Sequence, residues 1–184
     1  MRMDYREYDK VIEVKKGDTV TVTDPCYDRG SGAEIHVPVG RYQAFYEKVD
    51  EGDWGIRVSR CAIAPEGCDT WDVEHAHRIK TTSVGVDAGL CGFFVNKPDY
   101  EDAAWDEFCD KLTEADRAYE KDTGRKYKNV YHTDEGFFTS SGYGDGEYNV
   151  YMLDMDGKIG IEIVFIGDEE EDEEYDWDED EDDE

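Results

Sequence analysis

A segment near the C-terminus, residues 137–166, constrains the fold more than any other part of the chain. Apolar and polar residues alternate through 148–153 and again through 159–165, a period of two that is typical of β-strands. Asp156-Gly157 lies between the two runs, and glycine accepts the positive φ that a two-residue hairpin turn needs. The segment therefore predicts a β-hairpin, and the glycine-rich loop 142–146 leads into it.

Most of the remaining chain also has the patterns of strands. β-Branched or alternating apolar residues occupy 10–14, 18–23, 34–37, 41–49, 54–64, 78–86 and 91–95, and 41–64 is predicted to be a second hairpin. One segment, 101–121, instead has apolar residues three and four apart, which predicts a helix with Trp105, Phe108 and Leu112 buried against the sheet. The expected fold class is α+β: a mainly antiparallel β-sheet or sandwich with one long helix and an acidic C-terminal tail.

Acidic residues dominate the composition. The chain has 49 Asp and Glu against 20 Lys and Arg, a net charge of −29. Residues 168–184 hold 15 of those acids and no base, so residues 1–167 keep 34 acids against 20 bases, a net charge of −14. We predict one β-rich globular domain over 1–167 and a disordered tail over 168–184. A field of this sign repels nucleic acid and anionic membranes and attracts basic proteins.

The cysteines and the N-terminus bear on the compartment. Five cysteines are present without a CxxC pair, and the first ten residues hold no apolar segment of the kind found in secretory signals. No apolar run is long enough to span a membrane. We expect reduced thiols and a cytoplasmic protein.

Three loops at predicted strand ends each contain an aspartate next to, or one residue away from, a glycine or a proline. The residues are Asp24, Asp87 and Asp145. Because strand-end loops of an antiparallel sheet can converge, one hypothesis is a Ca²⁺ or Mg²⁺ site built from these carboxylates, with Ser140 and Ser141 as neutral ligands. The alternative is that each aspartate only forms a turn by bonding to its own backbone. No DxDxDG loop is present to favour the metal site, and no other cofactor is expected.

The same loops carry a resemblance to a known family. The segments TDPCY, VDAGLCGFF and SSGYGDGEYNVYMLDMDGKIGIEIVFI resemble a family of bacterial and phage proteins known only as a domain of unknown function, whose members end in a Ser-Gly-Tyr-Gly-Asp-Gly hairpin and an Ile-Val-Phe strand. The resemblance covers most of residues 18–167 and leaves the tail outside. It implies a compact β-rich domain and no established reaction, so no catalytic residue follows from it.

Motifs of catalysis are weak. His75 and His77 follow Cys68 at a spacing that is not typical of zinc ligands, and we expect a surface pair at a strand end. Cys91 lies between Leu90 and Gly92, which favours a small buried hydrophobe over a nucleophile. No phosphate-binding loop or dinucleotide fingerprint is present, so we do not expect an enzyme.

The tail combines carboxylates with two aromatic anchors. The residues predicted to contact a partner are Asp168, Glu169, Glu170, Glu171, Tyr175 and Trp177. A segment of this kind can lie in a basic groove, and such grooves commonly belong to nucleic-acid-binding proteins. The leading hypothesis is an inhibitor or regulator that occupies this surface by mimicking nucleic acid, of an anti-CRISPR or anti-restriction type given the resemblance to phage proteins. The alternatives are a small-ligand or divalent-metal-binding domain at the three aspartate loops and a toxin-immunity protein.

Overall fold

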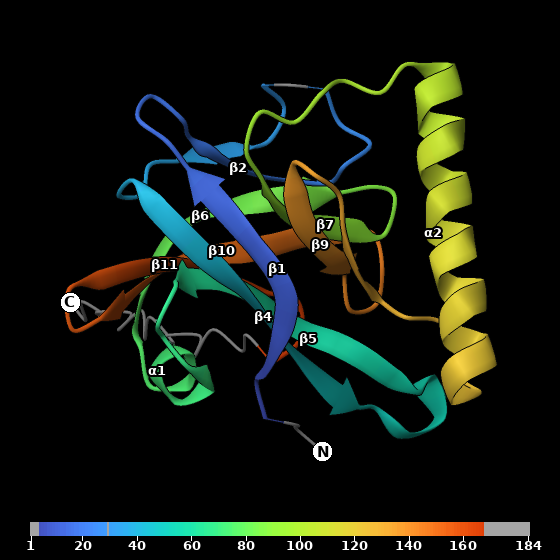
Figure 1. Cartoon of the computed structure of the whole chain (residues 1–184). Helices are drawn as coiled ribbons and strands as arrows, with labels where there is room; N and C mark the ends of the chain where they lie inside the picture. Colours follow the sequence, from blue (N-terminus) through green and yellow to red (C-terminus); the bar gives the residue numbers. More distant parts are fainter. Residues whose placement is uncertain (1–3, 29, 168–184) are drawn as a thin grey trace, which may run out of the picture.

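The computed structural model describes residues 4–28 and 30–167, which form two antiparallel sheets, one long helix and two short helices. The six-stranded sheet has the order β1 (Arg6–Val14), β4 (Gly40–Asp50), β5 (Ile56–Pro65), β11 (Lys158–Val164), β10 (Gly146–Met155) and β6 (His77–Val86). The five-stranded sheet has the order β3 (Ala33–Ile35), β2 (Val20–Thr23), β7 (Leu90–Phe94), β9 (Gly136–Ser140) and β8 (Val130–His132). The helices are η1 (Gly52–Trp54), α1 (Thr70–Glu74) and α2 (Asp102–Thr123). Figure 1 shows their arrangement, which confirms the predicted α+β fold of antiparallel sheets and one long helix.

The C-terminal hairpin forms as predicted. β10 and β11 pair in register from Asn149 opposite Val164 to Met155 opposite Lys158. The turn residues Asp156 and Gly157 both have positive φ, 55° and 88°, the combination that a type I′ turn requires. The hairpin lies inside the six-stranded sheet, with β5 on one side and β6 on the other.

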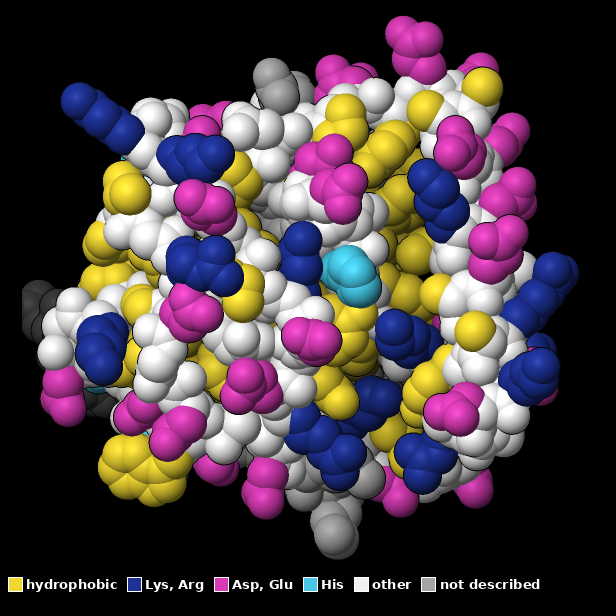
Figure 2. Space-filling model, in the orientation of Figure 1, with side chains coloured by type: hydrophobic (Ala, Val, Ile, Leu, Met, Phe, Trp, Pro, Cys, Tyr) yellow, Lys and Arg dark blue, Asp and Glu magenta, His cyan; other side chains and the backbone are white. Residues whose placement is uncertain are grey.

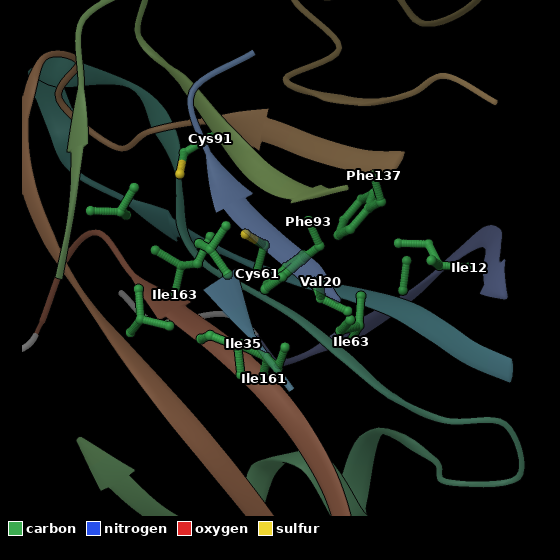
Figure 3. Close-up of a cluster of buried hydrophobic side chains, with 14 of the residues drawn as sticks. Ile12, Val20, Ile35, Cys61, Ile63, Cys91, Phe93, Phe137, Ile161 and Ile163 are labelled. Carbon is green, nitrogen blue, oxygen red and sulfur yellow. The ribbon is translucent and has the colours of Figure 1, made fainter. Parts of the chain in front are cut away.

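The main core fills the space between the two sheets, as Figure 3 shows. Side chains from β1, β5 and β11 of one sheet point toward side chains from β2, β3, β7 and β9 of the other, among them Ile12, Cys61, Ile63, Ile161 and Ile163 facing Val20, Ile35, Cys91, Phe93 and Phe137. β7 and β9 approach so closely that a Cβ on Gly92 would overlap the carbonyl oxygen of Phe137. Glycine is therefore required there by space.

Helix α2 covers the outer face of the five-stranded sheet, along the right of Figure 1. Its Phe108 stacks on Phe138 of β9 with ring centroids 5.5 Å apart. Gly124 ends the helix in the left-handed region, and its N–H donates to the Glu120 carbonyl. Phe108 is buried as predicted, whereas Trp105 and Leu112 are only half-buried. Leu112 lines the groove beside the helix, which leaves its side chain partly open.

The outer face of the six-stranded sheet holds a second core and a buried ionic cluster. Glu162 of β11 is fully buried and accepts hydrogen bonds from Tyr5 Oη at 2.9 Å and Arg78 Nη2 at 2.8 Å. Arg60 Nη1 lies 3.3 Å from the same carboxylate. Arg78 also donates to the carbonyls of Val73, Glu74 and Ala76, so it fixes the end of α1 to the sheet.

No helix among the described residues is long and apolar enough to cross a membrane.

Candidate functional site

Asp24, the first of the three predicted aspartates, is a buried anchor between two loops. Its side chain is wholly buried, and Oδ1 accepts the Cys26 N–H at 2.9 Å. Oδ2 accepts the N–H groups of Asp87 at 2.9 Å and Ala88 at 2.6 Å. Both oxygens are therefore engaged by backbone donors, and the carboxylate ties the loop after β2 to the turn between β6 and β7.

The three aspartate loops come together at one end of the sandwich. The Ser141 N–H donates to the Gly89 carbonyl at 3.0 Å, which joins the loop of Asp145 to the turn of Asp87. Burial, and then negative charge nearby, first that of Asp87 and Asp24, raises the pKa of Tyr27, which follows Asp24 in the same loop. The side chains of Asp87 and Asp145 are exposed.

This convergence does not amount to a set of metal ligands in the part of the chain that the structure describes. No group of three or more His, Cys, Asp or Glu residues there is placed to hold an ion. Of the two serines predicted as neutral ligands, Ser141 is buried, and its hydroxyl donates to the Gly144 carbonyl at 2.7 Å. The two serines therefore do not both point at the aspartates. The turn-forming role is directly visible for Asp24, since it bonds to Cys26 two residues on.

The weaker catalytic motifs have structural roles. Cys91 is fully buried, and burial followed by the nearby Cys61 raises its pKa well above the usual range, opposite to what a nucleophile needs. His75 stacks on Trp71 with centroids 4.1 Å apart, and both His75 and His77 are exposed.

A groove between α2 and the edge of the five-stranded sheet was not predicted. It has a volume of about 470 Å³, and at its rim Tyr8 Oη lies 2.8 Å from His132 Nδ1 and 3.4 Å from Lys128 Nζ. Burial and then the charge of Asp9 raise the pKa of Tyr8 to about 12. Because an activated nucleophile needs a lowered pKa, this trio does not point to chemistry at Tyr8. The apolar part of the groove is lined by Tyr100, Phe108, Leu112 and Tyr131.

A row of carboxylates runs along the exposed side of α2. Asp102, Asp106, Asp110 and Glu114 recur every fourth residue, and all four are exposed. Side chains four apart lie on one face of a helix, so these carboxylates form one line. Among the described residues, an ion pair in this half of the helix joins Glu107 to Lys111 at 3.1 Å, beside the line and not within it. Figure 2 shows acidic side chains along the upper part of this helix.

The tail residues predicted to bind a partner, Asp168, Glu169, Glu170, Glu171, Tyr175 and Trp177, lie outside the described residues.

Comparison with models of protein families, with curated proteins and with solved structures found no match to this chain.

Proposed function

We propose that this protein binds a basic surface of a partner protein and inhibits or regulates the partner by occupying that surface. The observation that carries the proposal is the line of carboxylates on α2. Residues 102–114 contain five acids and one lysine, a net charge of −4. At 1.5 Å per residue they span about 18 Å, and the four carboxylates of the line lie about 6 Å apart, less than twice the 3.4 Å spacing of charges along one strand of DNA.

Stability of the helix does not account for this row. Three successive like-charge pairs four residues apart destabilise an isolated helix by roughly 0.2–0.5 kcal/mol each. The helix dipole favours acids near the N-terminus, but the effect fades within the first turn and so reaches Asp102 and not Glu114. A row that costs folding free energy is explained if the carboxylates meet cations of a partner.

The rest of the surface supports the same kind of partner. The described residues hold 34 acids and 18 bases, and Arg60 and Arg78 are committed to the buried Glu162. The sign of the field favours a protein that normally binds nucleic acid, because such proteins present cationic grooves. The acidic tail would add a second contact, with Tyr175 and Trp177 as anchors.

The resemblance of the glycine-rich hairpin to bacterial and phage proteins supports an anti-CRISPR or anti-restriction role, in which the blocked surface belongs to a nuclease or to its DNA-binding subunit. An immunity protein against a basic toxin would use the same contacts on a different partner.

The test compares two variants of equal charge. One carries Asp106→Asn, Asp110→Asn and Glu114→Gln on the row, and the control carries Glu7→Gln, Glu13→Gln and Glu34→Gln, which are exposed on β1 and β3. A partner captured from a bacterial lysate is titrated with each by calorimetry at low and physiological salt, with and without competing DNA.

We expect the row variant to bind at least roughly tenfold more weakly than the control variant. Removing charges that contact the partner lowers the affinity more than removing the same number of charges elsewhere on the surface. DNA should compete, and binding of the unmodified chain should weaken as salt rises, since the screening length falls to about 8 Å at 0.15 M. Equal loss in both variants, or salt-insensitive binding without competition, would contradict the proposal.

A further inference from the structure

A basic, aromatic pocket interrupts the acidic surface where the β4–β5 hairpin meets the C-terminal end of α2. It has a volume of about 510 Å³ and its lining includes no acid. Figure 2 shows Lys and Arg side chains gathered at the lower centre and right of the molecule, below the end of the groove. The charged and aromatic lining residues are Lys48, Arg57, Arg125, Lys126, Trp54 and Tyr127.

The cations of this basic pocket crowd one another. Burial, and then the charges of Arg125 and Arg6, lower the pKa of Lys48. Within the described residues, no ion pair joins Lys48, Arg57, Arg125 or Lys126 to a carboxylate. Like charges held together without a counter-ion are unfavourable, so the pocket favours an anion.

Two of the aromatic residues are open to a ligand. Trp54 is 70% exposed and Tyr127 is 55% exposed. Arg57 bridges Trp54 and the glycine-rich loop, since its Nε donates to the Trp54 carbonyl at 2.9 Å and its Nη1 to the Gly142 carbonyl at 3.5 Å. A fixed guanidinium beside exposed aromatic rings suits a ligand that carries both carboxylates and rings.

The described chain ends against β5, the strand that supplies Arg57 to this basic pocket. Phe165 and Ile166 both donate to the Ser59 carbonyl on β5, at 2.8 and 3.1 Å, and a Cβ on Gly167 would lie 4.0 Å from the Arg60 guanidinium. Arg57 is three residues from Arg60 on the same strand, about 10 Å away. The next 17 residues hold 15 acids, Tyr175 and Trp177, and could extend about 56–61 Å.

We propose that the basic pocket binds the chain's own acidic tail, residues 168–184, in the free protein. The pocket is cationic and aromatic, and the tail is acidic and carries two aromatic residues, so the two are complementary. Covalent attachment a short distance away raises the effective concentration of the tail to about the millimolar range. An external polyanion would have to approach a molecule of net charge −29, whereas the tail needs no encounter. The inference concerns the isolated protein and does not depend on any partner.

Carbodiimide coupling of the full chain, read by mass spectrometry, tests the proposal. The reagent joins a carboxylate to a lysine amine only when the two groups touch. Lys48 and Lys126 report on the basic pocket, and Lys15 and Lys16 are exposed controls at the β1–β2 turn, at the opposite end of the molecule in Figure 1. The tail is long enough to reach either place, so reach alone does not select the pocket.

We expect roughly tenfold more coupling of tail carboxylates to the pocket lysines than to the control lysines, since docking concentrates the tail there. The preference should vanish in 1 M salt, where the screening length is about 3 Å. Arg125→Gln should lower it and Arg41→Gln, the same change at an exposed site on β4, should not. Tyr175→Ala with Trp177→Ala should lower it without any change of charge.

Three results would overturn the proposal. One is even coupling over all exposed lysines in low salt. Another is coupling only between chains, seen as covalent dimers, which would make the occupant a second copy. The last is absence of the preference together with binding of a labelled single-stranded DNA through Arg125, which would make the pocket a site for an external polyanion.

Discussion

Replacing Asp24 with asparagine tests whether the converging aspartate loops are a structural joint. The carboxylate is fully buried and accepts three backbone N–H groups at 2.6–2.9 Å. Asparagine keeps one accepting oxygen and places an amide NH₂, a donor, against N–H groups that are also donors. Hydrogen bonds to charged groups contribute about 1.5–3 kcal/mol each, so losing one or two should lower the free energy of unfolding by about 1.5–6 kcal/mol.

The controls are Asp87→Asn and Asp145→Asn, the same chemical change in the neighbouring loops. Their side chains are exposed, and only the backbone N–H of Asp87 meets Asp24, so each should stay within about 0.5 kcal/mol of the unmodified protein. The assay is urea denaturation followed by circular dichroism. For a chain of this size, 1.5–6 kcal/mol corresponds to a fall in Tm of roughly 3–24 °C.

The alternative hypothesis, a Ca²⁺ or Mg²⁺ site, predicts a different result. Millimolar metal would raise Tm by mass action, and Asp87→Asn or Asp145→Asn would abolish the rise. The structural role is refuted if Asp24→Asn costs no more than the two exposed substitutions.

Four further outcomes follow from the packing. Gly157→Val should cost of order 1 kcal/mol or more in urea unfolding, because valine is strained at a φ of 88°. Phe108→Ala should cost about 3–5 kcal/mol and the half-buried Leu112→Ala clearly less; an equal cost would mean that the groove closes over both. Glu162→Ala should cost about 3–5 kcal/mol by leaving buried guanidinium groups without their anion, and an unchanged midpoint would show that water replaces it. Burial and two nearby lysines lower the pKa of His132, so its NMR titration should fall below about 6.5; the stability that it contributes is present above that pH and is lost as pH falls toward the lowered value.

Local sequence patterns predicted the elements that local chemistry determines. The hairpin at Asp156-Gly157 and the helix that ends at Gly124 both depend on residues a few positions apart, and both were found where they were expected. The short helix α1 was missed because its five residues are too few to establish a period, although Asp69 and Asp72 form a capping box at its start.

Long-range choices could not be predicted in the same way. The segments that became β1 and β2 are joined by a tight turn at Gly17, yet β1 pairs with β4 while β2 pairs with β3 and β7 in the other sheet. Glu162 alternates with Ile161 and Ile163 and so has the pattern of a solvent-facing residue. It is buried because α1 and Tyr5, distant in sequence, cover that face of the sheet.

Only part of the candidate site was predicted, because the rest depends on contacts between residues distant in the sequence. The convergence of three loops followed from antiparallel topology, but the use of both oxygens of Asp24 depended on where two backbone N–H groups 63 and 64 residues away came to lie. The basic pocket had no signature at all, since Lys48, Arg57 and Arg125 come from separate parts of the chain and are outnumbered by acids in composition.

The distribution of charge along α2 connects the two proposals. Residues 102–114 carry a net charge of −4, whereas residues 115–128, which lead into the basic pocket, carry five bases and three acids, a net charge of +2. The helix dipole favours acids in the first turn and cations in the last turn. Neither effect extends to the middle of a 22-residue helix. A tail docked at the basic end would neutralise it and leave the acidic row as the dominant field of the helix. A basic partner would then be drawn to the row first, and the tail, held only by screened contacts, would be free to transfer to the partner as the complex forms.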